Sequence, residues 1–250
     1  MSGRILVTGG ASGLGAAIVR ALAGQGYDVL FTYRSSEEAA SGLVAELAQT
    51  HPERGIAAKA LDLADRAALD GFCDEIEDEG FHGLVHNAGQ SYDALAAMLA
   101  QDRAETAMQI NFWSLTRLAK ALVRGMIRAR SGRIVAIGSV AASQANPGNA
   151  AYAATKGALE SYCRTLAIET AKRGITVNVI APGFIDTGMM APYAAYRAGM
   201  ERQIPLGRFA QTDEVAALAA FLMGKGAAYI TGATLPVDGG LTAMMGVHRG

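Results

Sequence analysis

Short apolar runs alternate along the chain with longer stretches in which apolar residues recur every three or four positions. Runs that stay almost wholly apolar are typical of strands buried on both faces of a parallel sheet. They indicate a sheet of about seven strands. We predict strands at residues 4–8, 28–33, 56–61, 82–86, 132–138, 175–180 and 234–237.

The stretches between these runs have the spacing of helices that cover a sheet with one apolar face. Ser36 and Thr212 are the expected N-caps of two of them, because a hydroxyl can bind free backbone N–H groups. Residues 101–130 form one long helix or a broken pair, since Asn111 competes there for backbone hydrogen bonds. Residues 189–203 are expected to be a mobile lid with helical parts. We predict helices at residues 14–24, 37–49, 65–79, 101–130, 152–172 and 213–223.

Strands and helices alternate without a repeat or a linker, which predicts an α/β fold: a doubly wound parallel sheet with helices on both faces. The chain has 250 residues, near the upper limit for one core, so we expect a single Rossmann-type domain over residues 1–250. Ligands of such sheets bind at the carboxyl ends of the strands. Residues that follow the strands are therefore the candidates for a site.

Composition narrows the class of protein. Hydrophobic residues make up 51% of the chain and charged residues 18%, which allows a large core. The net charge of -1 argues against a nucleic-acid partner, because such proteins neutralise phosphates with cations. Cys73 and Cys163 are interpreted as buried thiols, and no Cys/His cluster has the spacing of a metal site. With no signal-peptide pattern, and with polar residues in the charge-free run 134–155, we expect a cytoplasmic protein without a membrane partner.

A glycine-rich turn joins the first strand to the first helix. In a βαβ unit such a turn places a phosphate at the helix N-terminus. Gly9 and Gly13 permit tight turning and close approach of the backbone to a pyrophosphate, and Gly15 allows close packing of the helix on the strand. The context predicts a nucleotide site, and an ordinary βα turn is the alternative. The cofactor-binding residues predicted here are Thr8, Gly9, Ser12, Gly13, Leu14 and Gly15.

The end of the second strand indicates which dinucleotide binds. An acidic residue there would hold the ribose 2′-hydroxyl of NAD, but no carboxylate occurs before Glu37. Arg34 can pair with a 2′-phosphate and Ser35 can add a hydrogen bond, so we predict NADP(H). A solvated Arg34 is the alternative. Asp62, which precedes Leu63 after the third strand, either accepts from the adenine amine or caps the next helix.

Residues suited to carbonyl chemistry gather between Ser139 and Lys156. Ser139 follows a predicted strand, and Tyr152 and Lys156 are one helical turn apart on one face. A serine that orients an oxygen, a tyrosine that donates a proton and a lysine that lowers the tyrosine pKa form a carbonyl-reducing set. Each residue alone has an ordinary structural explanation, whereas the three together predict catalysis.

In order and spacing, these motifs resemble the short-chain dehydrogenase/reductase family over essentially the whole chain. One departure is His86, where the family often has a second asparagine. It is interpreted as a tolerated variation at the strand end, and altered local packing near the cofactor is the alternative. The resemblance implies that Ser139 orients the substrate oxygen, Tyr152 donates the proton and Lys156 holds the nicotinamide ribose. Asn111 would hold a water that links Lys156 to solvent. Further cofactor contacts are implied for Asn87, Ala88, Gly89, Pro182, Gly183, Ile185 and Thr187, the last with the nicotinamide carboxamide.

Within the family the chain is most similar to 3-oxoacyl-[acyl-carrier-protein] reductases, notably over residues 173–187 and 204–208. This implies reduction of a 3-oxoacyl thioester in fatty-acid or polyketide/polyene-type biosynthesis, by a homotetramer. Two long helices and the region from Tyr229 to the tail would make the subunit contacts. Arg130 and Arg173 match the residues beside the cleft that dock the acidic carrier protein, although helix C-termini favour cations in any case.

Two other functions are left open. The chain could be an NADP-dependent dehydrogenase of a small alcohol, sugar or polyol, because the lid sets substrate choice and one sequence does not decode it. A non-catalytic nucleotide sensor of the same family is the second alternative. Such a protein should have lost part of the Ser139, Tyr152 and Lys156 set, which is complete here.

Overall fold

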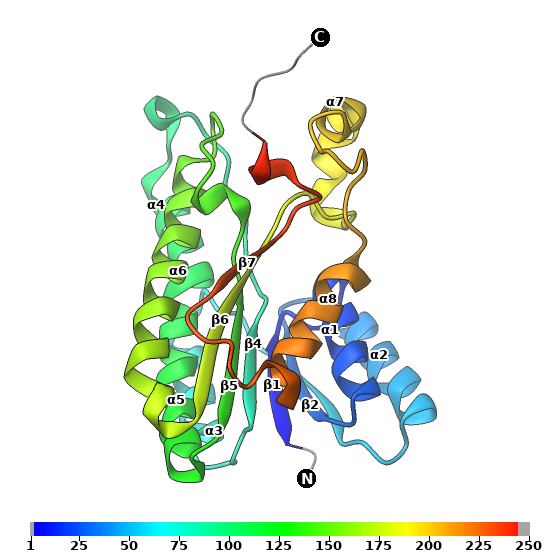
Figure 1. The fold of residues 1–250 in the computed structure, drawn as a ribbon, viewed down its shortest axis with the longest axis vertical. Coiled ribbons are helices and arrows are strands. Elements are labelled where there is room, and N and C mark those ends of the chain that lie inside the picture. Colours follow the sequence, from blue (N-terminus) through cyan, green and yellow to red (C-terminus); the bar gives the residue numbers. More distant parts are fainter. Residues whose placement is uncertain (1–2, 245–250) are drawn as a thin grey trace.

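The computed structural model describes residues 3–244, whose strands form one parallel seven-stranded sheet (Figure 1). The strand order is β3-β2-β1-β4-β5-β6-β7, so the winding reverses between β1 and β4. This confirms the predicted doubly wound sheet. The strands are β1 Arg4–Thr8, β2 Asp28–Tyr33, β3 Ile56–Ala60, β4 Gly83–His86, β5 Gly132–Ile137, β6 Ile175–Pro182 and β7 Thr234–Val237.

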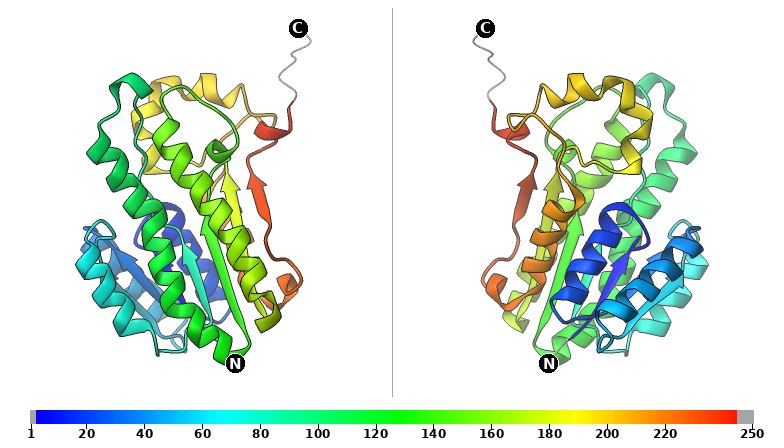
Figure 2. Two further views of the ribbon diagram at one scale, coloured as in Figure 1. Left: turned by 90° about the vertical axis from the view of Figure 1, so that its left-hand side faces the viewer. Right: turned by 90° about the vertical axis from the view of Figure 1, so that its right-hand side faces the viewer.

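Helices cover both faces of the sheet, with α1, α2 and α8 on one face and α3, α5 and α6 on the other (Figures 1 and 2). Alternate side chains of each strand point to opposite faces. Ile5 and Val7 of β1 therefore pack against the first group of helices and Leu6 against the second, all three with no exposed area. The helices are α1 Gly13–Gly24, α2 Glu37–Thr50, α3 Arg66–Ile76, α4 Gln101–Met108, α5 Ser114–Ala129, α6 Ala150–Thr170, α7 Arg197–Glu201 and α8 Thr212–Met223.

A π-helical turn over Gln109–Trp113 separates α4 from α5, so residues 101–130 are a broken pair rather than one α-helix. Asn111 lies inside this turn and is fully buried. A π-turn inserts an extra residue and re-aims side chains, frequently at functional sites. The unfavourable asparagine in the sequence thus marks the interruption.

The helix caps differ in part from the prediction. Ser36 occupies the N-cap position of α2, but its side chain makes no capping hydrogen bond. Thr212 is the first residue of α8 and not its cap, so that prediction is wrong. Gln211 is the cap because it forms a reciprocal capping box with Glu214, whose carboxylate accepts from the Gln211 N–H at 2.8 Å.

The predicted lid has the expected helical parts: 3₁₀ turns over Gly188–Tyr196 lead into α7. The final tail residues, expected to join a subunit contact, are 245–250 and lie outside the described residues. None of the helices within residues 3–244 has the length and apolar character needed to cross a bilayer.

Candidate active site

The glycine-rich turn between β1 and α1 lies at the carboxyl edge of the sheet, the upper end in Figure 1. Gly9 and Gly13 have φ of +66° and +51°, a left-handed conformation that favours glycine. A Cβ on Gly15 would lie 1.9 Å from the carbonyl oxygen of Gly9, so Gly15 packs on the turn itself rather than on the strand. Ser12 is exposed at the N-cap position of α1, and its side chain makes no capping hydrogen bond. Leu14 is buried, and the first turn of α1 contains no acidic residue. This helix N-terminus suits an anion.

Two further predicted cofactor contacts follow the neighbouring strands. Arg34 and Ser35 are exposed just beyond β2 on the same edge. The Asp62 carboxylate accepts from the Ala64 N–H at 2.9 Å, whereas Asp65 caps α3. The helix-capping role considered for Asp62 is therefore wrong, and its adenine contact stays a prediction. Leu63 is buried beside it.

The loop after β4 is fastened to the glycine-rich turn. The Asn87 amide donates to the carbonyl oxygens of Thr8 and Gly9, each at 3.1 Å. The backbone N–H groups of Asn87 and Ala88 donate to the Thr8 hydroxyl oxygen at 3.1 and 3.0 Å. A Cβ on Gly89 would lie 3.4 Å from Nζ of Lys156, so this glycine lets the lysine approach.

Ser139, Tyr152 and Lys156 come together at the end of β5. Tyr152 and Lys156 share one face of α6, as predicted, and Nζ of Lys156 lies 5.6 Å from the centroid of the Tyr152 ring. The buried Lys156 ammonium donates to the Ile137 carbonyl oxygen at 2.7 Å. The Ser139 hydroxyl accepts from the Ala141 N–H at 3.1 Å, and it lies near enough to the Tyr152 phenol to influence the pKa of that phenol.

Burial dominates the protonation of this group. It raises the pKa of Tyr152; the nearby Ser139 hydroxyl opposes that rise and the charge of Asp93 adds to it. Burial lowers the pKa of Lys156 to about 8, against the opposing charge of Glu160. Lys156 is not among the groups that shift the Tyr152 pKa here, so the expected lowering of that pKa by Lys156 stays a prediction.

The Asn111 side chain joins two elements of the site. Its amide donates to the Gln90 carbonyl oxygen at 3.0 Å and to the Thr155 hydroxyl at 2.9 Å, and its oxygen accepts from the Gln90 N–H at 2.8 Å. Both amide protons are thus used by protein groups. A water on Asn111 would have to donate to one of its oxygens.

The loop after β6 and the lid close the other side of the cleft. Thr187 faces the glycine-rich turn, since a Cβ on Gly13 would lie 3.7 Å from its methyl group. The chain reaches Thr187 from β6 through Pro182, Gly183 and Ile185. Ile185 forms an isolated parallel β-bridge with Ala210. The Tyr193 hydroxyl of the lid donates to the Asp93 carboxylate in the loop after Asn87-Ala88-Gly89, which links the two rims of the cleft.

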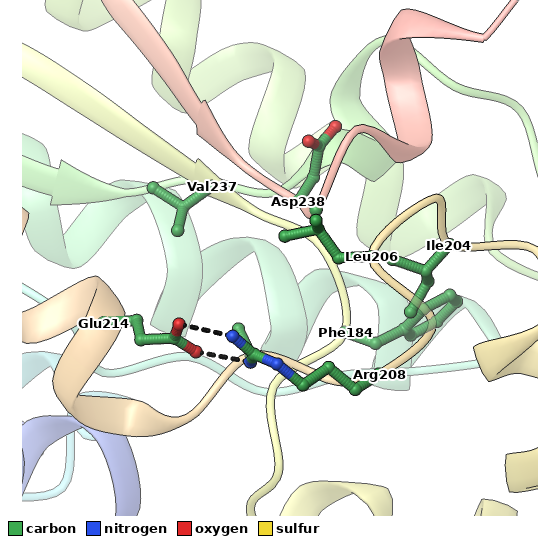
Figure 3. A pocket seen from close by; sticks show the side chains of 9 residues that line it. Phe184, Ile204, Leu206, Arg208, Glu214, Val237 and Asp238 are labelled. Carbon is green, nitrogen blue, oxygen red and sulfur yellow. Dashed lines mark hydrogen bonds and ion pairs between the residues drawn. The ribbon is translucent and has the colours of Figure 1, made fainter.

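Small pockets flank the lid. One of about 140 Å³ includes Thr187 and Tyr193. Another of about 80 Å³ lies between the end of β7 and the segment before α8, where Arg208 binds Glu214 through two hydrogen bonds of 2.7 and 2.8 Å (Figure 3). Neither is lined by Tyr152 or Ser139, so the geometry of the converging side chains, and not a closed cavity, identifies the site.

Arg130 and Arg173 do not lie beside this cleft within one subunit. They are exposed at the ends of α5 and of the turn after α6, where β5 and β6 begin. The length of β5 places them roughly 20 Å from Ser139 by the rise of an extended strand. The two segments touch each other, because a Cβ on Gly174 would lie 2.5 Å from the Arg130 carbonyl oxygen.

Sequence reasoning missed Thr155, Gln90 and Asp93. Thr155 sits beside Lys156 in mid-helix, where a β-branched residue is mildly disfavoured, and that signal could have drawn attention to it. Its hydroxyl donates to the Tyr152 carbonyl oxygen at 2.7 Å and accepts from Asn111. Gln90 acts through backbone atoms, which no side-chain pattern reveals.

Comparison with known proteins points in the same direction. A family model described as enoyl-(acyl carrier protein) reductase matches residues 9–242. A 3-oxoacyl-[acyl-carrier-protein] reductase of Pseudomonas aeruginosa is 41% identical over 94% of this chain and 96% of its own length. The Escherichia coli protein of that description is 40% identical over the same shares.

Solved structures agree with the fold. A Beutenbergia cavernae protein described as a candidate NAD(P)-dependent gluconate 5-dehydrogenase with bound NADP has a TM-score of 0.92 and 33% identity, covering 98% of each chain. A short-chain dehydrogenase/reductase of Serratia marcescens has a TM-score of 0.89 and 32% identity, covering 96% of this chain and 98% of its own.

Proposed function

Because the chain belongs to the short-chain dehydrogenase/reductase family, we propose that this oxidoreductase reduces 3-oxoacyl thioesters on acyl carrier protein with NADPH. The observation that carries the proposal is 41% identity to a reductase of that description over 94% of the chain, with Ser139, Tyr152 and Lys156 converging at one point. The product is the 3-hydroxyacyl thioester, in fatty-acid or polyketide/polyene-type biosynthesis. The complete catalytic set disfavours a nucleotide sensor.

The residues present fit a phosphorylated dinucleotide. The cradle at Gly9, Gly13 and Gly15 leaves no room for a Cβ at Gly15, and the N-terminus of α1 carries no competing acid. Arg34 and Ser35 are exposed where a 2′-phosphate would be held, which favours NADP(H) over NAD(H). Asn87-Ala88-Gly89, Lys156 and Thr187 line the route from this cradle to Tyr152 and are proposed to hold the nicotinamide half.

NADPH, when held by these residues, would supply the hydride that reduces the ketone carbon. Ser139 donates a hydrogen bond to the carbonyl oxygen and fixes its position against Tyr152. The raised pKa of Tyr152 keeps the phenol protonated, so it can give its proton to the oxygen as negative charge grows. The Lys156 ammonium favours the phenolate that this transfer leaves and would pass it a proton, which restores the Tyr152 phenol. Asn111 holds the turn through which a water would return a proton to Lys156.

Carrier docking at Arg130 and Arg173 is proposed to involve a second subunit. Arg130 and Arg173 lie at the opposite end of the sheet from Tyr152, so a carrier bound there serves the site of another copy more readily than its own. We include in the proposal a homotetramer with closed symmetry and a cytoplasmic location.

A second function is oxidation of a small polyol or sugar acid. The observation in its favour is the TM-score of 0.92 with the protein described as a candidate gluconate dehydrogenase. Steady-state kinetics with acetoacetyl-carrier protein, gluconate and a panel of alcohols separates the two. The proposal expects the carrier-bound ketone to have the highest kcat/KM with NADPH, and a preference for gluconate would replace it.

A further inference from the structure

His86 is a fully buried titratable side chain to which the proposed chemistry assigns no part. It ends β4, between the glycine-rich turn of the cofactor site and the π-turn that carries Asn111. Its Nδ1 lies 3.2 Å from the Thr8 hydroxyl oxygen and its Nε2 lies 3.3 Å from the Asn111 carbonyl oxygen. The ring thus bridges the two halves of the site.

The neighbouring hydrogen bonds fix the proton on this ring. The Thr8 hydroxyl oxygen already accepts from the N–H groups of Asn87 and Ala88, so its own proton is free to be donated to Nδ1 of His86. Nδ1 is therefore an acceptor, and the ring proton sits on Nε2, where it donates to the Asn111 carbonyl oxygen. Burial, and secondarily the charge of Lys156, lower the pKa of His86 to about 3, so the ring is neutral at ordinary pH.

The hydrogen bond from His86 to Asn111 matters because it holds the backbone of the π-turn at Asn111. The Asn111 side chain cannot make this bond, since it already binds other protein groups. Asn111 binds Gln90 and Thr155, and Thr155 in turn binds the Tyr152 carbonyl oxygen. A shift of the Asn111 carbonyl would move this chain of contacts against Lys156. The same ring accepts from Thr8, which also receives the first N–H groups of the loop after β4.

We propose that His86, as the neutral Nε2–H tautomer, is a positioning residue that fixes the Asn111 turn relative to the Thr8 end of the cofactor site. The ring itself gives and takes no proton in the reaction. It holds Asn111, where the proton would return to the catalytic residues, in a fixed position relative to the bound dinucleotide. The effect on turnover rests on the proposed function, whereas the tautomer does not.

The test has one arm without catalysis. The chain has 4 histidines, so ¹⁵N-histidine labelling and long-range ¹H–¹⁵N NMR can assign His86 by comparison with His86→Gln. We expect the Nε2–H tautomer throughout pH 6 to 8, with no titration. An Nδ1–H ring, or an imidazolium in this range, would overturn the proposal even if the enzyme reduces no thioester.

The second arm compares two variants. His86→Gln can carry its amide N–H to where Nε2 lies, whereas His86→Leu has no N–H for the Asn111 carbonyl. We expect kcat to fall about tenfold in His86→Leu, with the KM for NADPH nearly unchanged, and to recover in His86→Gln. Equal losses, or no loss, in two folded variants would overturn the positioning role. If the wild type reduces no 3-oxoacyl thioester, the proposed function is wrong. The positioning role is then tested by comparing the variants on whichever carbonyl substrate the wild type reduces.

Discussion

The Lys156 ammonium lies 5.6 Å from the centroid of the Tyr152 ring and donates to the Ile137 carbonyl oxygen at 2.7 Å. Both side chains project from one face of α6, and the hydrogen bond ties that face to the end of β5. The relation is therefore set by a helix and a strand rather than by a loop. Groups held on such elements are positioned more closely than groups on loops.

Removing Lys156 should change how stability depends on pH. Burial lowers the pKa of Lys156 from 10.5 to about 8 in the folded protein. Between these values the unfolded chain holds a proton that the folded chain has lost, so this residue makes the free energy of unfolding rise with pH. From pH 8 to 10.5 the wild type should gain about 3 kcal/mol relative to Lys156→Met in denaturant unfolding without cofactor. A difference between the two proteins that stays constant across this window would contradict the lowered pKa.

Arg34→Asp should reverse the cofactor preference. The substitution removes a guanidinium at the end of β2 and places a carboxylate where a 2′-phosphate would bind. Loss of a charge-assisted hydrogen bond, about 1.5–3 kcal/mol, predicts a fall of kcat/KM for NADPH of at least about tenfold. The kcat/KM for NADH should be unchanged or higher. Equal effects on both cofactors would mean that Arg34 is a solvated surface residue.

Gly15→Ala should damage the dinucleotide cradle, whereas Gly24→Ala in the same helix should not. The new Cβ at Gly15 would lie 1.9 Å from the Gly9 carbonyl oxygen, and at Gly24 it would meet nothing within 4 Å. We expect Gly15→Ala to lower the melting temperature and weaken NADPH binding. Gly24→Ala should raise the free energy of unfolding by up to about 1 kcal/mol. Normal NADPH fluorescence titration in Gly15→Ala would show that the turn does not hold the cofactor.

Arg130→Gly should make the protein more stable while weakening carrier docking, so the two effects can be told apart. Arg130 has a φ of +51°, and a left-handed non-glycine residue costs about 1–2 kcal/mol. Glycine also increases the entropy of the unfolded chain, which offsets part of the gain from removing this cost. The free energy of unfolding of Arg130→Gly should therefore exceed that of the wild type by about 0.5–1 kcal/mol. Arg128→Gly, inside the last turn of α5, should instead lose about 1 kcal/mol.

Docking then shows in kinetics with the Arg130→Gly protein. Its kcat/KM for carrier-bound substrate should fall several-fold, while that for a free acetoacetyl thioester stays at the wild-type value. Arg173→Glu should behave likewise. Unchanged rates on the carrier-bound substrate in both variants would remove Arg130 and Arg173 from the docking surface.

The fold was predictable because the inner strands β1, β2, β4, β5 and β6 are buried on both faces and are therefore apolar runs in the sequence. The edge strands β3 and β7 are only partly buried. The placement of Tyr152 and Lys156 on one face followed from helical spacing alone. The π-turn at Asn111 was visible only as an unfavourable residue, since its exact form depends on packing against Gln90 and Thr155.

What the sequence did not reveal depends on tertiary contacts. Gln211 replaces Thr212 as the cap of α8 because Glu214, which also binds Arg208, reaches its N–H. Burial, rather than Lys156, governs the Tyr152 pKa, and no local pattern encodes the depth of a side chain. The separation of Arg130 from the cleft likewise follows from the length of a strand.

The most direct measurement is the reduction of acetoacetyl-carrier protein by NADPH in the wild type and in Tyr152→Phe. The account predicts measurable wild-type turnover and a loss of at least about 100-fold in kcat for the variant, because proton donation is removed. NADPH binding, followed by fluorescence, should change little, because the glycine cradle and Arg34 are intact. Turnover of Tyr152→Phe close to that of the wild type would contradict the account.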